Sequence, residues 1–352
     1  MRHPEIAFFS LFMLVSGSAV SQNGSVNPDA ATFDPDGTAH ITRVVPMPTT
    51  VSPEAQKWLK DIEQETTMPT SNLAERRVQT EKWQRSQSAE AKRLFPVNLE
   101  PKDIAGVHTD IITPLITPPQ NLKRVLINLH GGGFNSDSGS LIEGIPICNL
   151  AKIKVVSVYY RLAPENPFPA AVDDVVAVYK ELLKTYQPNQ VGIFGTSAGG
   201  ILTAEVTVRL KQLGLPMPGA LGLFTMLADF SRTGDSRQLF TLNGFSGGIA
   251  PSNPDRGHDD EYVGKTDLHD AVLSPLFADL HGFPPSLLVS GTRDALLSDT
   301  STFHRALLRA GVDAQLVVFE AMPHAFWYHF QFPETRECLD LMAAFFDQKL
   351  AK

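Results

Sequence analysis

Gly195-Thr196-Ser197-Ala198-Gly199 lies between an apolar stretch, 190–194, and a longer segment, 201–213, in which apolar residues recur at spacings of three and four. The first stretch predicts a buried strand and the second a helix. A Gly-x-Ser-x-Gly turn between them is typical of a nucleophile elbow, which holds a serine hydroxyl clear of a sheet at the positive end of a helix. Side chains two residues before or after the serine would strike the neighbouring strand and helix, and glycine stands at both positions. The pattern predicts that Ser197 is a nucleophile.

A second glycine-rich motif, His130-Gly131-Gly132-Gly133-Phe134, directly follows a buried strand predicted over 124–129. Three consecutive glycines let a backbone approach a ligand closely with its N–H groups pointing inward. Acyl transfer needs such donors where negative charge develops on the carbonyl oxygen, and one donor is typically worth ~3 kcal/mol. A flexible loop is the alternative, but the strand ahead of the motif and the elbow after it favour an anion-stabilising loop.

A nucleophilic serine needs a base, and the base needs an acid that fixes its tautomer. On a sheet with a serine elbow, the chain order is serine, acid, histidine. Asp294 follows a strand predicted over 286–290, and His324 follows one predicted over 315–319. These two residues are therefore the candidate acid and base for Ser197.

Other acids and histidines compete for these roles. Asp299 is the rival acid, but its position at the start of a helix over 299–309 predicts an N-cap. His304 lies inside that helix, and His329 lies further from its strand. His130 is expected to brace the glycine loop. Three more histidines lie in predicted loops with no second ligand at metal spacing, so no metal site is predicted: His258, His269 and His281.

The composition bounds the class of protein. The chain has 352 residues, of which 43% are hydrophobic, and can bury a large core in one big domain or in one domain with a lid. Its formal net charge of −8 and the lack of long Lys and Arg runs argue against a nucleic-acid or anionic-membrane surface.

Residues 1–21 have the layout of a secretory signal peptide. A weakly basic start precedes an apolar run over 6–15, and Ala19 and Ser21 suit the −3 and −1 positions of a cleavage before Gln22. The run is too short to span a bilayer. Export to a periplasm or the medium is the prediction, and an uncleaved anchor or a buried segment is the alternative.

Residues 22–105 are predicted to hold a poorly ordered leader and an N-terminal helical cap. The first cap helix opens at Ser52-Pro53, with Ser as N-cap and Pro at the first helical position, and runs through Trp58. The second opens at Ser71-Asn72 and runs through Trp83. Because neither helix has a strand beside it, the two form a separate helical layer.

Residues 106–352 are predicted to form the catalytic domain. Strands and helices alternate along it, which predicts an α/β fold with a mostly parallel central sheet covered by helices on both faces. Residues 228–275 are irregular and long for a connection, as expected of a lid or binding segment. Four apolar side chains in it would cover a site: Phe230, Phe240, Leu242 and Phe245.

Taken together, five features resemble the hormone-sensitive-lipase-like esterases of bacteria, which have the α/β-hydrolase fold. They are the motif 130–134, Tyr160-Arg161-Leu162-Ala163-Pro164-Glu165, the elbow continued to Gly200, Asp294 and His324. The resemblance covers roughly Gly106 to the C-terminus. The common elbow of this family has Asp where this chain has Thr196, and the Thr form marks a branch of the same family.

The resemblance implies several properties. Gly132 and Gly133 would supply two oxyanion N–H groups and Ala198 the third. The reaction would be hydrolysis of carboxylic esters with short to medium acyl chains, without a cofactor and through an acyl-enzyme on Ser197. The partner would be a small-molecule ester, with no nucleic acid and no stable membrane insertion, and a homodimer is left open.

Two alternatives to a carboxylesterase remain at this point. A lactonase, a carbohydrate acetyl esterase or an amidase would use the same triad. An inactive hydrolase fold that serves as a binding protein is the alternative from a different class, although such relatives usually lose the serine or the histidine.

The two cysteines lie on the first and last helices of the catalytic domain, Cys148 after the glycine loop and Cys338 on the closing helix. In an α/β-hydrolase these helices cover the same face of the sheet, and export would permit a disulfide. Two buried free thiols that behave as small hydrophobic side chains are the alternative.

Overall fold

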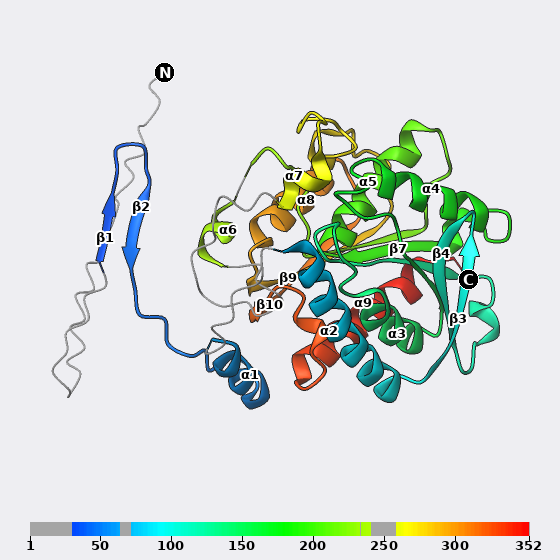
Figure 1. Ribbon diagram of the computed structural model, residues 1–352, viewed down its shortest axis with the longest axis horizontal. Coiled ribbons are helices and arrows are strands. Elements are labelled where there is room, and N and C mark those ends of the chain that lie inside the picture. Colours follow the sequence, from blue (N-terminus) through cyan, green and yellow to red (C-terminus); the bar gives the residue numbers. More distant parts are fainter. Residues whose placement is uncertain (1–29, 64–71, 233, 241–257, 352) are drawn as a thin grey trace, which may run out of the picture. The chain divides into compact units, whose positions relative to one another are not determined.

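The computed structural model describes residues 30–63, 72–232, 234–240 and 258–351 (Figure 1). They fall into two units that divide after Met47. The first unit contains β1 (Ala30–Phe33) and β2 (Ala39–Thr42), an antiparallel pair whose residues are all exposed. This hairpin was not predicted because its strands show no alternation of apolar and polar residues. The predicted signal peptide, 1–21, lies outside the described residues.

The second unit is built on an eight-stranded sheet in the order β10-β9-β8-β7-β5-β6-β4-β3. All neighbours pair in parallel except β4 with β6 and β3 with β4. The strands are β3 (Val97–Ile104), β4 (Val107–Pro114), β5 (Val125–Leu129), β6 (Lys154–Val158), β7 (Val191–Thr196), β8 (Ala220–Phe224), β9 (Ser286–Arg293) and β10 (Ala314–Pro323). The predicted α/β class with a mostly parallel sheet is confirmed.

The central strands are buried on both faces because helices cover the sheet on each side (Figure 1). Side chains alternate between the faces. Val125, Ile127 and Leu129 belong to one core with apolar residues of three helices, α4 (Ala170–Leu182), α5 (Ala198–Gln212) and α8 (Leu297–Arg309).

The opposite face packs against α3 (Ser140–Ala151) and α9 (Pro333–Lys349), which contact each other. The ring of Phe194 on β7 lies 5.5 Å from that of Phe346 on α9. Cys148 and Cys338 lie on these two helices as predicted, and both are buried free thiols. The free-thiol alternative is therefore the one found.

The edge strand β3 was not predicted, and it places the start of the sheet at Val97, ahead of Gly106 where the sequence pattern changes. Most of its residues are exposed, and it pairs only with β4. An exposed strand of this kind needs no continuous apolar run. It also tolerates Pro101, because an edge strand has a neighbour on one side only, and the missing N–H of proline can face solvent.

Two helices precede this sheet, α1 (Pro53–Glu63) and α2 (Leu73–Leu94). Ser52 caps α1 by accepting from Ala55 N–H at 3.0 Å, and its own hydroxyl donates to Glu334 of α9 at 2.8 Å. Asn72 caps α2. Trp58 of α1 is buried and lies 5.0 Å, ring to ring, from Phe332 just before α9. Both helices predicted ahead of the sheet therefore form.

The predicted lid segment is described only in part. It contains α6 (Asp235–Leu239) and α7 (His258–Val263), and Phe230 packs partly buried against the core. Leu242 and Phe245 lie outside the described residues. Among the described helices, none combines the length and apolar character needed to cross a membrane.

Candidate active site

Ser197 stands between β7 and α5 with a strained backbone, at φ 58° and ψ −122°. Its N–H donates to the carbonyl oxygen of Phe224 on the neighbouring strand at 2.9 Å. Positive φ is rare for a residue with a side chain and persists where the surrounding structure enforces it. A Cβ added to Gly195 or Gly199 would overlap the carbonyl oxygen of Leu129, so the elbow requires glycine at both positions.

The glycine loop lies beside the elbow. A Cβ on Gly131 would sit 3.0 Å from the carbonyl oxygen of Thr196 and 3.4 Å from Cβ of Ser197. Gly132 and Gly133 have φ of 109° and 59°, a conformation that favours glycine. Within the part of the chain that the structure describes, the N–H groups of Gly132, Gly133 and Ala198 donate to no protein acceptor. These three donors are therefore available to a ligand.

His130 braces this loop, as predicted. Its Nδ1–H donates to the carbonyl oxygen of Gly131 at 2.8 Å, and its ring stacks on Tyr160 with centroids 4.1 Å apart. The Tyr160 hydroxyl in turn donates to the carbonyl oxygen of His130 at 2.7 Å. The loop is thus held by the tyrosine that opens the motif 160–165.

Arg77 of α2 links this helix to the residue after the glycine loop and to the motif 160–165, and no pattern in the sequence pointed to it. Its guanidinium donates to both carboxylate oxygens of Glu165 at 2.7 Å, to Ala163 at 2.8 Å and to the Asn135 carbonyl at 2.6 Å. The hydrogen bond from Arg77 lowers the pKa of Glu165 to about 2. The sequence offered one signal for this contact: Glu165 is a charged residue in the motif 160–165, and the sequence alone does not show its partner.

The candidate base and acid meet as predicted. His324 Nδ1 lies 3.0 Å from Asp294 Oδ1, and both side chains are buried. Asp294 Oδ1 also accepts from Leu296 N–H at 2.9 Å, and Oδ2 accepts from the Ser290 hydroxyl at 2.9 Å. Because the ionised carboxylate only accepts, it holds the proton of His324 on Nδ1 and leaves Nε2 free for a second proton.

Thr225 joins this pair and was missed by the sequence analysis. Its hydroxyl donates to Asp294 Oδ2, and its oxygen lies 3.0 Å from His324 Nδ1. Thr225 directly follows β8 and has a φ of 41°. The signal that could have found it is its position one residue beyond a buried strand.

Asp294 is held in its ionised form. Burial by itself raises the pKa of its carboxyl group, but the charge of His324 and the hydrogen bonds from His324, Thr225 and Leu296 lower it further than burial raises it. The net pKa lies below the ordinary value for aspartate. Asp294 therefore carries a negative charge at neutral pH.

In the described part of the chain, the side-chain hydrogen bonds of His324 and Asp294 involve none of the rival residues. α8 begins at Leu297, so Asp299 lies in its first turn and is not the predicted N-cap. Burial raises the pKa of Asp299 to about 6. His304 Nε2 lies 3.3 Å from the Ala314 carbonyl oxygen, and the ring of His329 lies 4.8 Å from that of Trp58. Among the described residues, no group of three or more His, Cys, Asp or Glu side chains could hold a metal ion.

Four neighbouring strands carry the site at one edge of the sheet. In the order β7, β8, β9 and β10, each strand is followed at once by one member: Ser197, Thr225, Asp294 and His324. The carboxyl ends of parallel strands are where α/β sheets bind ligands. Thr225 and His324, which are 99 positions apart in the sequence, thus lie within hydrogen-bonding distance of each other.

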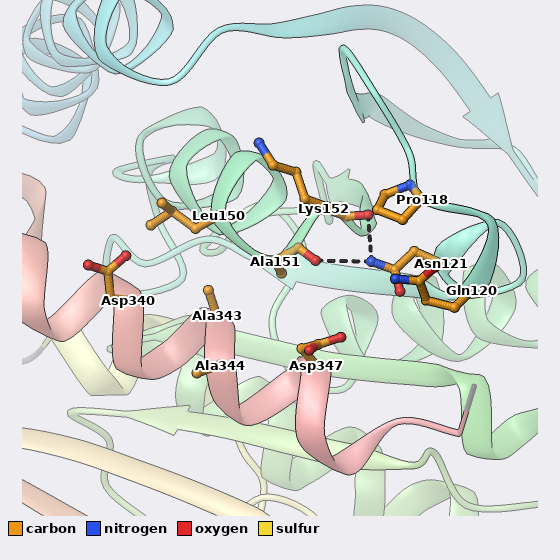
Figure 2. Close-up of a pocket in the computed structure, with 10 residues that line it drawn as sticks. All are labelled: Pro118, Gln120, Asn121, Leu150, Ala151, Lys152, Asp340, Ala343, Ala344 and Asp347. Atoms are coloured by element: carbon orange, nitrogen blue, oxygen red, sulfur yellow. Dashed lines mark hydrogen bonds between the residues drawn. The ribbon is translucent and has the colours of Figure 1, made fainter.

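A surface pocket of about 290 Å³ lies at the opposite edge, between the ends of α3 and α9 and the turn η1 (Pro119–Asn121) (Figure 2). Two of its polar side chains, Asn121 and Asp347, are engaged within the protein. Asn121 donates to the carbonyl oxygens of Ala151 and Lys152 at 3.2 and 3.0 Å, and Asp347 pairs with the buried Arg124 at 2.7 Å. None of the predicted site residues lines this pocket, so we assign it no catalytic part.

The alpha/beta hydrolase fold family matches residues 126–328, which is more than half of the chain. The chain belongs to this family. An esterase of Acinetobacter venetianus is 30% identical over 272 residues, covering 72% of this chain and 84% of the relative. An acetyl-hydrolase of Streptomyces hygroscopicus is 32% identical over 237 residues, covering 65% and 77%.

Solved structures give the same result for this alpha/beta hydrolase. The crystal structure of one esterase matches with a TM-score of 0.75 and 32% identity, covering 88% of this chain and 98% of the other. An esterase from the bacterial hormone-sensitive lipase family matches with a TM-score of 0.72 and 28% identity, covering 85% and 98%. The resemblance inferred from the motifs is confirmed.

Proposed function

We propose that this carboxylic ester hydrolase is a serine esterase that forms an acyl-enzyme on Ser197. One observation carries the proposal: a strained serine, a buried histidine and an ionised aspartate follow neighbouring strands at one edge of the sheet. The free N–H groups of Gly132, Gly133 and Ala198 lie in the loop and helix that flank that serine. Nucleophile, base, orienting acid and oxyanion donors are thus all available.

In the first half-reaction, Ser197 Oγ attacks the acyl carbon while His324 Nε2 takes the hydroxyl proton. Asp294 stabilises the imidazolium that results, because its carboxylate accepts from Nδ1–H. The oxygen of the former carbonyl group becomes negative and accepts hydrogen bonds from the three backbone donors, each worth ~3 kcal/mol. Collapse of the tetrahedral intermediate breaks the ester C–O bond, and the alcohol leaves with the proton from His324.

In the second half-reaction, water attacks the acyl-enzyme by the same route. His324 Nε2 takes a proton from the water, the oxyanion forms again at the same donors, and Ser197 leaves with the proton returned to Oγ. The acid product then departs. Every proton moves through His324, and apart from the ester and water every reacting group belongs to the chain.

A labelling experiment tests this mechanism. Diethyl p-nitrophenyl phosphate should react once per chain, as the Ser197 Oγ–P bond forms and p-nitrophenolate leaves. Peptide mapping by mass spectrometry should locate the label in the peptide that contains Ser197. A label on another residue, or hydrolysis that continues after complete labelling of Ser197, would contradict the mechanism.

Lactones, acetylated carbohydrates and amides are alternative substrates for the same catalytic residues. Because one relative is an acetyl-hydrolase, we favour substrates with a small acyl group. The rates with p-nitrophenyl acetate, simple lactones and acetylated sugars should be compared directly. A binding protein is disfavoured because every part of the triad is present. We also propose that the protein is exported after removal of 1–21, which rests on the sequence pattern alone.

We predict a preference for short acyl chains. The cap helices place Trp58 and Trp83 against the segment that follows His324, with Trp83 6.1 Å from Tyr328 by ring centroid. If this cover closes the acyl pocket, each methylene that fits adds ~0.8 kcal/mol, and the first that does not fit must displace packed side chains. kcat/KM for p-nitrophenyl esters should therefore peak at about two to eight carbons and then fall.

The control for chain length is an emulsified long-chain triglyceride assayed beside a soluble short-chain one. Hydrolysis of both at similar rates would show an open or readily opened cleft. It would reclassify the enzyme as a lipase and leave the triad untouched.

A further inference from the structure

Thr196, the residue that departs from the common elbow, has a fully buried hydroxyl group between two parts of the site. It lies on the face of β7 toward α3 and α9. Its Oγ1 donates to Glu143 Oε1 on α3 and accepts from Trp327 Nε1–H at 3.2 Å. A hydroxyl has one proton, so donation to Glu143 turns its lone pairs toward the indole N–H.

Glu143 is fully buried and belongs to a short chain of hydrogen bonds across the sheet. Its Oε2 accepts from Asn128 Nδ2 on β5 at 3.1 Å. Asn128 Oδ1 in turn lies 3.0 Å from the hydroxyl of Ser157 on β6. A buried network in which each of these groups has a partner specifies one arrangement of the elements that it joins.

Trp327 connects this network to the candidate base. It lies in η5 (Phe326–Tyr328), three residues after His324, and its side chain is fully buried. The intervening Ala325 has a φ of 54°, so the segment from His324 to Trp327 is a tight turn. The Thr196 hydroxyl therefore joins the segment that carries Ser197 to the segment that carries His324.

We propose that Thr196 and Glu143 are positioning residues that set the distance between Ser197 Oγ and His324 Nε2. Thr196 is adjacent in the chain to the nucleophile, and Glu143 fixes the direction of its hydroxyl group. The inference rests on the proposed function, because it assigns these residues to the serine–histidine pair. It explains how a threonine elbow works: the neutral hydroxyl of Thr196 accepts from Trp327 and donates to the carboxyl group of Glu143 on α3.

Glu143 is the titratable group at the centre of this arrangement. Burial raises its pKa to about 7, against hydrogen bonds from Thr196, Asn128 and Trp327 that lower it. Two other titratable groups interact with it, Tyr328 of η5 and Cys338 of α9, and burial raises the pKa of each well above its ordinary value. Both stay neutral near pH 7, and the ionised Glu143 accepts from Thr196 on Oε1 and from Asn128 on Oε2.

The test compares Thr196→Val, which keeps the shape and removes the hydroxyl, with Thr196→Ser, which keeps the hydroxyl. A misplacement of the pair by a fraction of an ångström should lower kcat of Thr196→Val by about 10- to 100-fold with little change in KM. The rate of labelling by diethyl p-nitrophenyl phosphate should fall in parallel. Thr196→Ser should stay within about threefold of the wild type in both measurements.

Glu143→Leu and Glu143→Gln give a second comparison. The leucine variant should lose as much kcat as Thr196→Val, and the glutamine variant, which keeps an acceptor for Thr196, should lose less. The Thr196→Val/Glu143→Leu double variant should lose no more than either single change, because both break one connection. If Glu143→Leu does not fold by circular dichroism, the two Thr196 variants decide alone.

Wild-type kcat in Thr196→Val, or an equal loss in Thr196→Ser, would overturn the inference. Failure of the proposed function looks different. In that case diethyl p-nitrophenyl phosphate would not label Ser197 even in the wild-type protein, whatever the residue at position 196.

Discussion

Ser197→Ala should lower kcat for p-nitrophenyl butyrate by roughly four to six orders of magnitude, because no acyl-enzyme can form without the hydroxyl oxygen. The fold should persist. The Ser197 side chain makes no capping hydrogen bond to α5, and alanine has the same Cβ at the strained backbone. Steady-state hydrolysis and the loss of labelling by diethyl p-nitrophenyl phosphate measure the effect, and thermal unfolding measures stability.

The matched control is Ser86→Ala, the same substitution at an exposed position of α2. It should leave kcat and labelling unchanged. Ser197→Ala with more than about a hundredth of wild-type kcat would contradict a nucleophilic role, because a residue of this kind contributes far more.

Asp294→Asn should lower kcat by about three to four orders of magnitude with KM nearly unchanged. The asparagine amide removes the negative charge that stabilises the imidazolium form of His324. If its NH2 group faces Nδ1, it also forces the proton of neutral His324 onto Nε2, which then cannot take the proton of Ser197. Single-turnover acylation measured by p-nitrophenolate release should fall with kcat.

Asp299→Asn is the control, since Asp299 is the rival acid and lies outside the contact with His324. It should keep kcat close to the wild-type value. A larger loss of kcat in Asp299→Asn than in Asp294→Asn would show that Asp299, and not Asp294, is the acid that orients His324.

The same aspartate affects stability in a defined direction. Because the pKa of Asp294 is lower in the folded protein than its ordinary value of ~3.9, its charge stabilises the fold above that pH. The contribution is lost as the pH falls through the folded-state pKa. Part of the acid unfolding of the wild-type protein should therefore be absent from Asp294→Asn.

Local patterns were sufficient for the buried strands and the elbow. The strands β5, β7 and β8 are apolar runs because helices cover both faces of the sheet, and such runs can be recognised in the sequence alone. The glycines at 195 and 199 were predictable because the turn itself leaves no room for a side chain. In contrast, β3 and the β1–β2 hairpin carry no apolar pattern, since their residues face solvent.

The sequence by itself determined the candidates for nucleophile, acid and base, because chain order and strand ends favour Ser197, Asp294 and His324 over their rivals. Only the tertiary structure decided which side chains support them. Thr225 meets Asp294, and Thr196 meets Glu143 and Trp327, through hydrogen bonds that span 53 to 131 positions. These contacts exist because parallel strands bring their carboxyl ends to one edge, and a helix laid across the sheet brings its buried face to a neighbouring strand. The order of residues along the chain does not show which distant side chains will form these hydrogen bonds.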